Sequence, residues 1–407
     1  MKRSLVFLVI LSWVGLVLFS PFFAPYAQRG WRKTKRVLGF TSEVSPILPP
    51  RTPLPPTRPL PTRFVPRKQI ETAKWFNGLT LHSQLEVQLG TNASQERERD
   101  KSYELELQLN VKVPTASRDL TAMNSQLASQ WSALAALVSN ATVSPFFHGL
   151  YERKTDWLNA RLIRLDQLLS RHNFYDCDTI LEIQNPETQR KLLFIQAEMD
   201  VVSDGSDPDR LISLPTNTAN YQPFTSYRWL KQSTNISPFI APKQEKLKRY
   251  QTELSTTNTL PQRRQELLGA IDQLRREIYD LNRYSYLVAS LDPFIVLPGF
   301  MFRYPEQAYR PKIGDYAVVV FENRFYPAIV GDIGPSYKIG EASLRLAKMI
   351  NPQATSYQRP VSDLKVSYFV FPGSAEKTFS VPDLHKWREK CAILLNEMGA
   401  FTGHLEQ

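Results

Sequence analysis

The sequence has 407 residues, of which 42% are apolar and 22% charged, and its formal net charge is +11 at pH 7. A chain of this length and composition can bury one large core or two modest ones. The excess positive charge lies in residues 1–74, which contain 13 Lys or Arg and 2 Glu, while the remaining residues carry 37 side chains of each sign. A nucleic-acid-binding domain carries its basic surface on the fold itself, so the neutral folded part argues against nucleic acid as a partner.

Residues 1–28 have the composition of a signal peptide or a membrane anchor. Lys2 and Arg3 precede an uncharged stretch that is long enough to cross a bilayer if it stays attached. This stretch lacks a clear A-x-A cleavage site, so removal and retention both stay open. In either case we expect an extracytoplasmic protein, secreted or attached to a membrane through this segment.

Residues 29–74 are expected to form a basic, proline-rich linker. Within them, residues 45–67 are rich in proline and arginine and contain no acidic residue. Such a composition favours an extended, polyproline-like conformation that cannot pack a core. We expect it to act as a spacer before the folded part.

Residues 75–170 are expected to form an N-terminal region of strands and helices. Alternating apolar and polar residues over 75–113 predict the strands of a small β unit. Apolar residues at helical spacing predict helices over 118–140 and 149–171. His172 then lies at a helix end, where a capping or surface role is expected.

The rest of the chain, residues 171–407, predicts a mainly β core. A β-hairpin is expected over residues 178–201, with its turn at residues 185–188. Further strands are predicted at 292–302, 315–332 and 364–373, and helices at 341–350 and 383–399. The expected fold class is therefore α+β, with a mainly β core and peripheral helices.

Residues 243–284 predict a helical hairpin inserted into this core. They are highly charged, carry apolar residues at helical spacing, and contain Pro261 between the two halves. The hairpin is either a docking arm or a solvated structural excursion. The second is favoured because the apolar seam is too short for a sustained coiled coil.

The two cysteines, Cys177 and Cys391, allow at most one disulfide, and two buried thiols are the favoured alternative. The five histidines have no close spacing and neither cysteine lies in a C-x-x-C pair. We expect no metal site and no cofactor.

Two carboxylates, Asp332 and Glu341, lie in the glycine-rich stretch 331–343. Asp332 is expected at the exit of a strand and Glu341 at the start of a helix, with a loop that lets both face one cleft. Such a pair can hydrolyse a glycosidic bond, with one acid and one base or nucleophile. The alternative is that Glu341 is a favourable charge at a helix N-terminus, which would lower its pKa, and that Asp332 is bonded to local backbone.

A second acidic segment contains Asp200 and Asp204. It partly imitates an EF-hand loop, but Val202 and Leu211 occupy positions where calcium ligands are needed. Charged loop structure or the binding of a cationic substrate is favoured over calcium binding.

Together the two acidic segments resemble the fungal chitosanases of glycoside hydrolase family 75. Members carry a segment of the type M-D-x-D-x-D-G after a strand, and later G-D-x-x-G followed by G-E-x-S. The matching residues here are Met199, Asp200, Asp204, Gly205, Gly331, Asp332, Gly340, Glu341 and Ser343. The resemblance covers about residues 170–400 without the helical hairpin, and Val202 and Ser203 depart from the motif.

This resemblance implies endo-hydrolysis of β-1,4-linked glucosamine polymers, chitosan or a related glycan, with inversion. It implies catalytic roles for Asp332 and Glu341, leaving open which is the acid, and substrate binding by Asp200 and Asp204. The G-D-x-G-P stretch also looks like that of double-psi β-barrel proteins, which implies a double-psi-like β-barrel. The alternative function is a non-catalytic, membrane-tethered glycan-binding or cell-envelope scaffold protein.

Overall fold

The computed structural model describes residues 80–84, 104–108, 131–160, 176–211, 221–256, 260–304 and 308–406. The chain divides into two compact units, residues 1–65 and 66–407, and all described residues belong to the second. The predicted signal or anchor and the linker lie outside the described residues. Within the described part, no helix is both long enough and apolar enough to cross a membrane.

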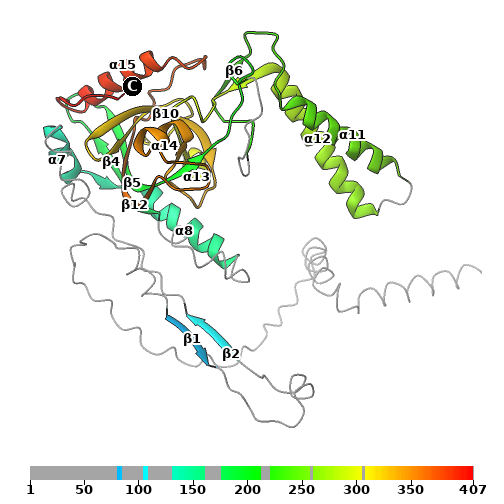
Figure 1. Ribbon diagram of the computed structural model, residues 1–407. Helices are drawn as coiled ribbons and strands as arrows, with labels where there is room; N and C mark the ends of the chain where they lie inside the picture. Colours follow the sequence, from blue (N-terminus) through cyan, green and yellow to red (C-terminus); the bar gives the residue numbers. More distant parts are fainter. Residues whose placement is uncertain are drawn as a thin grey trace, which may run out of the picture. The chain divides into compact units, whose positions relative to one another are not determined.

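Six strands close into a mixed β-barrel (Figure 1). They are β5 (Lys191–Val202), β8 (Phe294–Pro298), β9 (Tyr316–Phe321), β10 (Arg324–Gly334), β11 (Glu341–Ser343) and β12 (Val361–Val370). The order around the barrel is β11, β8, β10, β9, β12 and β5, and a pairing between β11 and β5 closes it. The pairs β8–β10 and β5–β11 are parallel, and the other four are antiparallel.

Two hairpins, as the sequence predicts, supply three of the six barrel strands, β5, β9 and β10. β4 (Cys177–Gln184) pairs with β5 across the turn at residues 185–188, and β3 (Thr142–Val143) extends the sheet beyond β4. β9 and β10 are joined by the two-residue turn Glu322–Asn323. The predicted mainly β core with peripheral helices is confirmed, while the double-psi-like arrangement stays a prediction.

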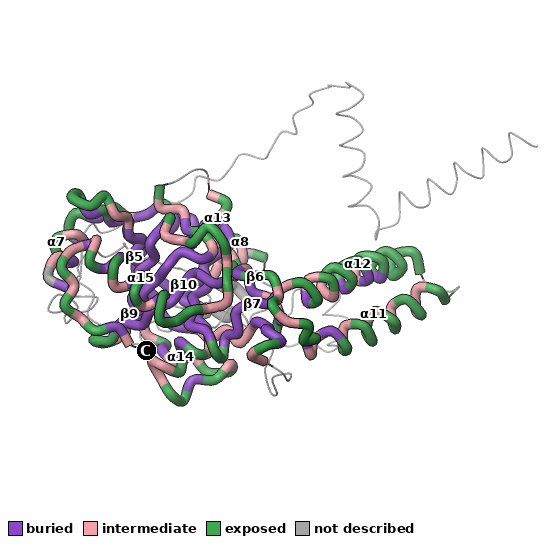
Figure 2. Tube along the Cα trace, turned by 90° about the horizontal axis from the view of Figure 1, so that it is seen from above, coloured by how far each residue is buried: buried purple, intermediate pink, exposed green. Residues whose placement is uncertain are grey.

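The barrel interior is filled by alternate residues of all six strands. This inner cluster includes Ala197, Ile295, Leu297, Val319, Val330, Ala342 and Tyr368. Helices α8 (Pro145–Asn159), α13 (Gly299–Arg303) and α14 (Leu344–Ile350) add side chains to the same cluster. Figure 2 shows the buried residues concentrated in the barrel. Burial of apolar surface, at about 25 cal/mol per Å², makes this cluster a source of stability for the barrel.

The outer face of the barrel is covered by α7 (Ser132–Ser139) and by the C-terminal helix α15 (Leu384–Glu397). Trp131 before α7 and Leu395 on α15 belong to this outer cluster. Cys391 lies in the outer cluster and Cys177 in the inner one, and both are buried free thiols. The disulfide alternative is therefore wrong.

The predicted helical hairpin is present as α11 (Ile240–Ser255) and α12 (Pro261–Arg283). The apolar face of α12 is buried and includes Leu267, Ile271, Leu274 and Leu281. The short strands β6 (Arg228–Leu230) and β7 (Tyr284–Tyr286) pair at the base of the hairpin. In Figures 1 and 2 the helices extend away from the barrel.

The N-terminal predictions fall partly within the described residues. β1 (Thr80–Gln84) and β2 (Glu104–Gln108) lie in the predicted small β unit and pair antiparallel. Helices α7 and α8 lie in the two predicted helical stretches, although α8 begins earlier, at Pro145. The end of the second predicted helix, with His172, lies outside the described residues.

Two predictions near the carboxylates are wrong. Strand β10 continues past Asp332 to Gly334, so Asp332 lies in the strand and not at its exit. Glu341 does not begin a helix, because residues 341–343 form strand β11, which pairs with β5 along its length and with β8 at Glu341 and Ala342. Helix α14 begins three residues later, after Ser343, whose Oγ accepts a hydrogen bond from the N–H of Leu346.

Candidate active site

Strand register places Asp332 and Glu341 on either side of Val296. Asp332 on β10 lies opposite Val296, and Glu341 on β11 lies opposite the same residue. Residues paired across neighbouring strands project from the same face of a sheet. Since adjacent strands lie about 4.8 Å apart, the backbones of the two acids are about 10 Å apart.

This face is the outside of the barrel. Val330 and Ala342 belong to the inner cluster, whereas Val296 belongs to the outer one. Val330 and Asp332 would share a face in a regular strand, but the register shifts between them. The irregularity turns the Asp332 side chain outward, a common function of β-bulges near active sites.

The Glu341 side chain is mostly buried, with 15% of its surface exposed. The pKa of Glu341 is raised to about 7, mainly by burial; Lys338 lowers it, and the negative charges of Asp200, Asp176 and Asp332 contribute to the rise. The expectation of a lowered pKa is wrong, because Glu341 lies in a strand and not at a helix N-terminus.

Two glycines allow this placement of Glu341. A Cβ on Gly334 would lie 2.6 Å from Oε2 of Glu341, so only glycine permits the close approach. Gly340 has φ of +91°, and a Cβ there would lie 2.3 Å from the carbonyl oxygen of Glu198. The predicted loop between the acids is therefore shaped by glycine at both ends.

Asp332 is held by three hydrogen bonds to one oxygen. Its Oδ1 accepts from the backbone N–H of Ser226 at 2.8 Å, from the Ser226 hydroxyl at 2.6 Å and from the N–H of Ile333 at 2.8 Å. Burial raises the pKa of Asp332, and these hydrogen bonds oppose the rise. They orient the carboxyl group and leave Oδ2 for a water molecule or a substrate.

Asp200 and Asp204 flank the pair formed by Asp332 and Glu341, with Asp200 beside Glu341 and Asp204 near Asp332. Asp200 is opposite Glu341 in the β5–β11 register. Asp204 accepts a hydrogen bond from the N–H of Gln222 at 2.9 Å, and burial together with the charge of Asp332 raises its pKa to about 6. The structure thus brings together all four side chains that the resemblance points to, in the order Asp200, Glu341, Asp332, Asp204.

Two basic residues complete one side of this cluster, and neither was expected. Nη2 of Arg359 is 2.8 Å from Oδ2 of Asp200, and its Nε is 3.3 Å from Oε1 of Glu198. Nζ of Lys338 is 3.8 Å from Oδ2 of Asp200 and 4.0 Å from Oε1 of Glu341. Lys338 stands three residues before Glu341 and could have been suspected, whereas nothing in the sequence links Arg359 to Asp200.

Helix α8 supports the segment that precedes Glu341. Lys154 and Asp176 form a buried ion pair at 2.8 Å, and Oδ2 of Asp176 accepts a hydrogen bond from the N–H of Ile339 at 3.1 Å. Trp157 stacks on Tyr337 with ring centroids 4.7 Å apart. The hydrogen bond to Ile339 and the ring contact with Tyr337 together hold the segment that precedes Glu341.

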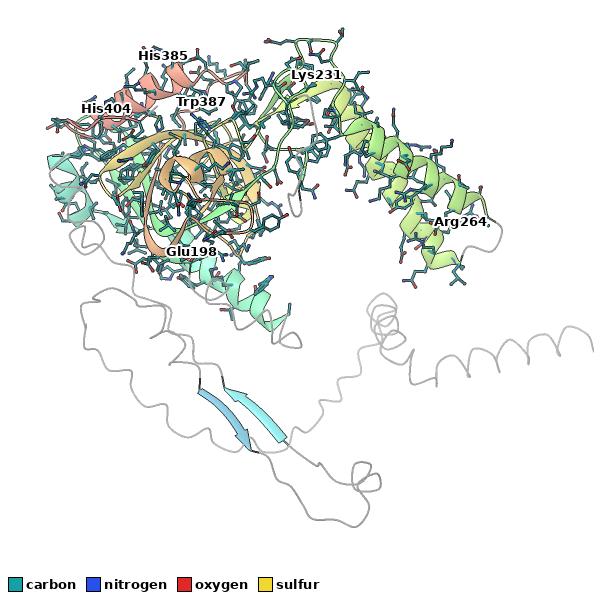
Figure 3. The ribbon with its side chains drawn as sticks, viewed as in Figure 1. Glu198, Lys231, Arg264, His385, Trp387 and His404 are labelled. Carbon is teal, nitrogen blue, oxygen red and sulfur yellow. The ribbon has the colours of Figure 1, made fainter. Side chains whose placement is uncertain are left out.

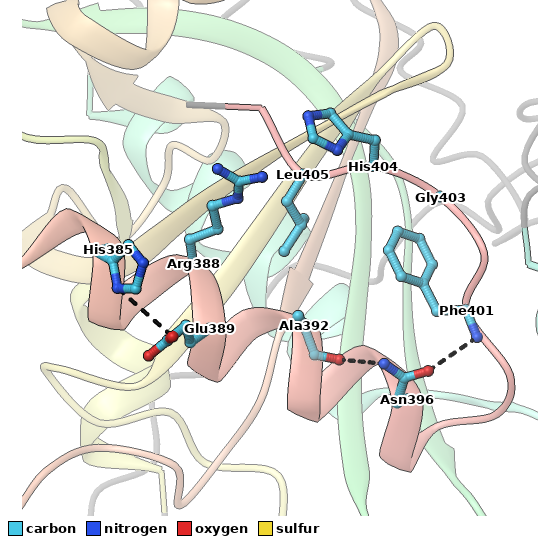
Figure 4. Close-up of a pocket in the computed structure, with 9 residues that line it drawn as sticks. All are labelled: His385, Arg388, Glu389, Ala392, Asn396, Phe401, Gly403, His404 and Leu405. Atoms are coloured by element: carbon cyan, nitrogen blue, oxygen red, sulfur yellow. Dashed lines mark hydrogen bonds and ion pairs between the residues drawn. The ribbon is translucent and has the colours of Figure 1, made fainter.

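Other possible sites lie elsewhere. Two cavities of about 450 and 300 Å³ lie along α15; both are lined by His385 and Arg388, and neither is lined by the four carboxylates. Figure 4 shows the residues that line the first. Figure 3 shows His385 and Trp387 on α15, at the opposite end of the barrel from Glu198. Within the described ranges, no group of three or more His, Cys, Asp or Glu side chains is arranged to hold a metal ion.

Comparison with known proteins agrees with this geometry. A family model described as fungal chitosanase of glycosyl hydrolase group 75 matches residues 199–402, which is half of the chain. No curated protein matches the chain. The matched residues include Asp200, Asp204, Asp332 and Glu341, together with Arg359. The chain therefore belongs to the group 75 glycosyl hydrolases, the fungal chitosanase family, and is a chitosanase-like glycoside hydrolase.

Proposed function

We propose that this protein cleaves β-1,4-linked glucosamine polymers, chitosan or a related glycan, within the chain and with inversion. The observation that carries the proposal is the register that sets Asp332 and Glu341 on one outward face, on either side of Val296. Both side chains are partly exposed, so a polysaccharide can reach them. Asp200 and Asp204 extend the acidic face on both sides and contact the substrate.

Glu341 is the general acid in this mechanism. A pKa of about 7 keeps its carboxyl group protonated in weakly acidic solution, where it can donate a proton to the leaving glycosidic oxygen. Its closest basic neighbour is Lys338, at 4.0 Å, and as the reaction proceeds this ammonium group stabilises the carboxylate that forms.

Asp332 is the general base. Hydrogen bonds from Ser226 and Ile333 favour the ionised form of its carboxyl group and fix its plane. It activates a water molecule that attacks the anomeric carbon on the face opposite the leaving group. Inversion requires carboxyl groups about 6.5 to 9.5 Å apart and retention only about 5 Å, and backbones about 10 Å apart are compatible with the wider spacing.

The remaining parts of the chain fit an exported enzyme. We propose that residues 171–407 form the catalytic domain and that residues 1–28 direct export, as a cleaved signal or as an anchor. Residues 29–74 would then separate the domain from its point of attachment. The alternative, a non-catalytic scaffold, gains no support from the family match.

The test is hydrolysis of chitosan by the full-length chain, followed as new reducing ends. The wild type should release oligosaccharides whose new reducing ends are first α-anomers by NMR, and Asp332→Asn and Glu341→Gln should each abolish release. Glu389→Gln is the matched control, because Glu389 is an exposed acid on α15. Chitosan binding without turnover in the wild type would overturn the proposal, and β-anomers would overturn inversion.

A further inference from the structure

The charges around the catalytic pair are distributed unevenly. On the Glu341 side, the carboxylate of Asp200 contacts both Arg359 and Lys338. On the Asp332 side, neither Asp204 nor Asp332 forms an ion pair with any Lys, Arg or His in the part of the chain that the structure describes. One side of the site is therefore acidic, whereas on the other side two cations balance the charges of Asp200 and Glu198.

The cationic side is open to a ligand. The side chains of Asp200, Lys338 and Arg359 are 26%, 31% and 25% exposed. Oδ2 of Asp200 accepts a hydrogen bond from Arg359, and its Oδ1 accepts one from the N–H of Val201 at 2.9 Å. Both oxygens of this carboxylate already have donors, so a further cation gains little there.

These two environments discriminate between the two sugars of a partly acetylated chitosan. A glucosamine unit carries an ammonium group, which gains nothing beside cations whose charge Asp200 and Glu198 already balance, and which the carboxylates of Asp204 and Asp332 attract because no cation among the described residues pairs with them. An N-acetylglucosamine unit carries a neutral amide, whose carbonyl oxygen accepts hydrogen bonds from ammonium and guanidinium groups.

We propose that Arg359 and Lys338 make the subsite beside Asp200 select an N-acetylglucosamine unit, while the subsite beside Asp204 takes glucosamine. This inference rests on the proposed function, and it assigns a specificity role to two residues outside the catalytic pair. The enzyme then prefers linkages flanked by unlike units over those of a fully deacetylated chain.

The experiment digests a partly acetylated chitosan with the full-length protein and identifies the sugars at the two new chain ends by mass spectrometry. One kind of end should be enriched in N-acetylglucosamine and the other in glucosamine. Lys338→Gln and Arg359→Gln should each reduce the N-acetylglucosamine enrichment. Arg359→Gln should also raise kcat/KM on fully deacetylated chitosan by about two- to five-fold, the contribution typical of a partly exposed ion pair.

Lys386→Gln is the matched control, because it removes the same charge from an exposed position on α15. Equal effects from this control would show general electrostatic attraction and overturn the proposal. Turnover with unbiased chain ends, or with the same bias in Lys338→Gln, would also overturn it. Absence of turnover on every chitosan would instead overturn the proposed function. Lys338→Gln keeps the test decisive if Arg359→Gln fails to fold, since Arg359 also faces the buried Glu198.

Discussion

The carboxyl group of Glu341 has a folded-state pKa of about 7, well above its ordinary value, mainly because it is buried. A general acid acts only while protonated, so its activity is complete well below this pKa and is lost as the pH rises through it. We expect kcat/KM on chitosan to fall above about pH 7. Lys338→Gln should move this limb to higher pH, because Lys338 lowers the pKa of Glu341. A limb that stays in place in Lys338→Gln would contradict the assignment of the acid.

The raised pKa of the same carboxyl group also lowers the stability of the folded protein as the pH rises. Between the unfolded pKa of 4.5 and the folded value of about 7, the unfolded chain releases its proton while the folded chain keeps it. Stability therefore falls as pH rises through this window, and Glu341 destabilises the fold most above pH 7. The strand position that raises the pKa of Glu341, the proposed acid, thus lowers the stability of the fold, as is common in active sites.

Sequence patterns could identify the acidic residues but not their environment. Asp332 and Glu341 stand in short motifs that can be read locally. The burial that raises the pKa of Glu341 comes from β8 and β5, which are distant in the sequence. Ser226 and Arg359 contact the acids from more than 100 positions away, and no local pattern links them.

At the scale of elements, the hairpins were predictable and β11 was not. Apolar alternation and turn residues mark β4–β5 and β9–β10 within a single stretch of chain. β11 has three residues, and it exists because β8 and β5 both offer free edges to it. A glycine followed by an acid and two small residues is equally typical of a helix start, which is why that prediction was wrong.

Helix α8 offers a test of how one element supports the active-site loop. Lys154→Met leaves Asp176 charged and buried, and breaking a buried pair in this way typically costs about 3 to 5 kcal/mol. The double variant Lys154→Met with Asp176→Asn removes both charges, and the Asn oxygen can still accept from Ile339. We expect the double variant to recover most of the lost free energy of unfolding, measured in urea.

The double variant also reports on catalysis. The charge of Asp176 raises the pKa of Glu341, so its removal should shift the alkaline limb of activity to lower pH. A purely structural role of the pair would change stability and leave this limb in place. Lys365→Met on β12 is the control, since its ion pair with Asp363 is exposed.

At the scale of the whole molecule, the family match and the folded core have different extents. The match begins at Met199, within β5, yet Trp131, Phe146 and Phe147 are fully buried in the clusters that enclose the barrel. Sequence motifs mark the residues that could carry out the chemistry, whereas the hydrophobic core is formed by packing between segments that are distant in the sequence. The proposed domain boundary at residue 171 therefore divides the segments with family motifs from those without them, but residues on both sides of it pack in the same hydrophobic clusters.

The helical hairpin gives the last prediction, because its core is separate from that of the barrel. Ile240, Leu281 and Tyr286 form a small cluster at its base, and Lys243 pairs with Glu277 at 2.5 Å just above it. Replacing residues 247–273 with a short Gly-Ser linker keeps the cluster and the ion pair. We expect unchanged kcat/KM on soluble chitosan oligosaccharides and a thermal midpoint within a few degrees of wild type. Loss of activity on oligosaccharides would contradict the independence of the hairpin from the active site. A loss confined to insoluble chitosan would instead indicate that the hairpin is a docking arm and not a solvated structural excursion.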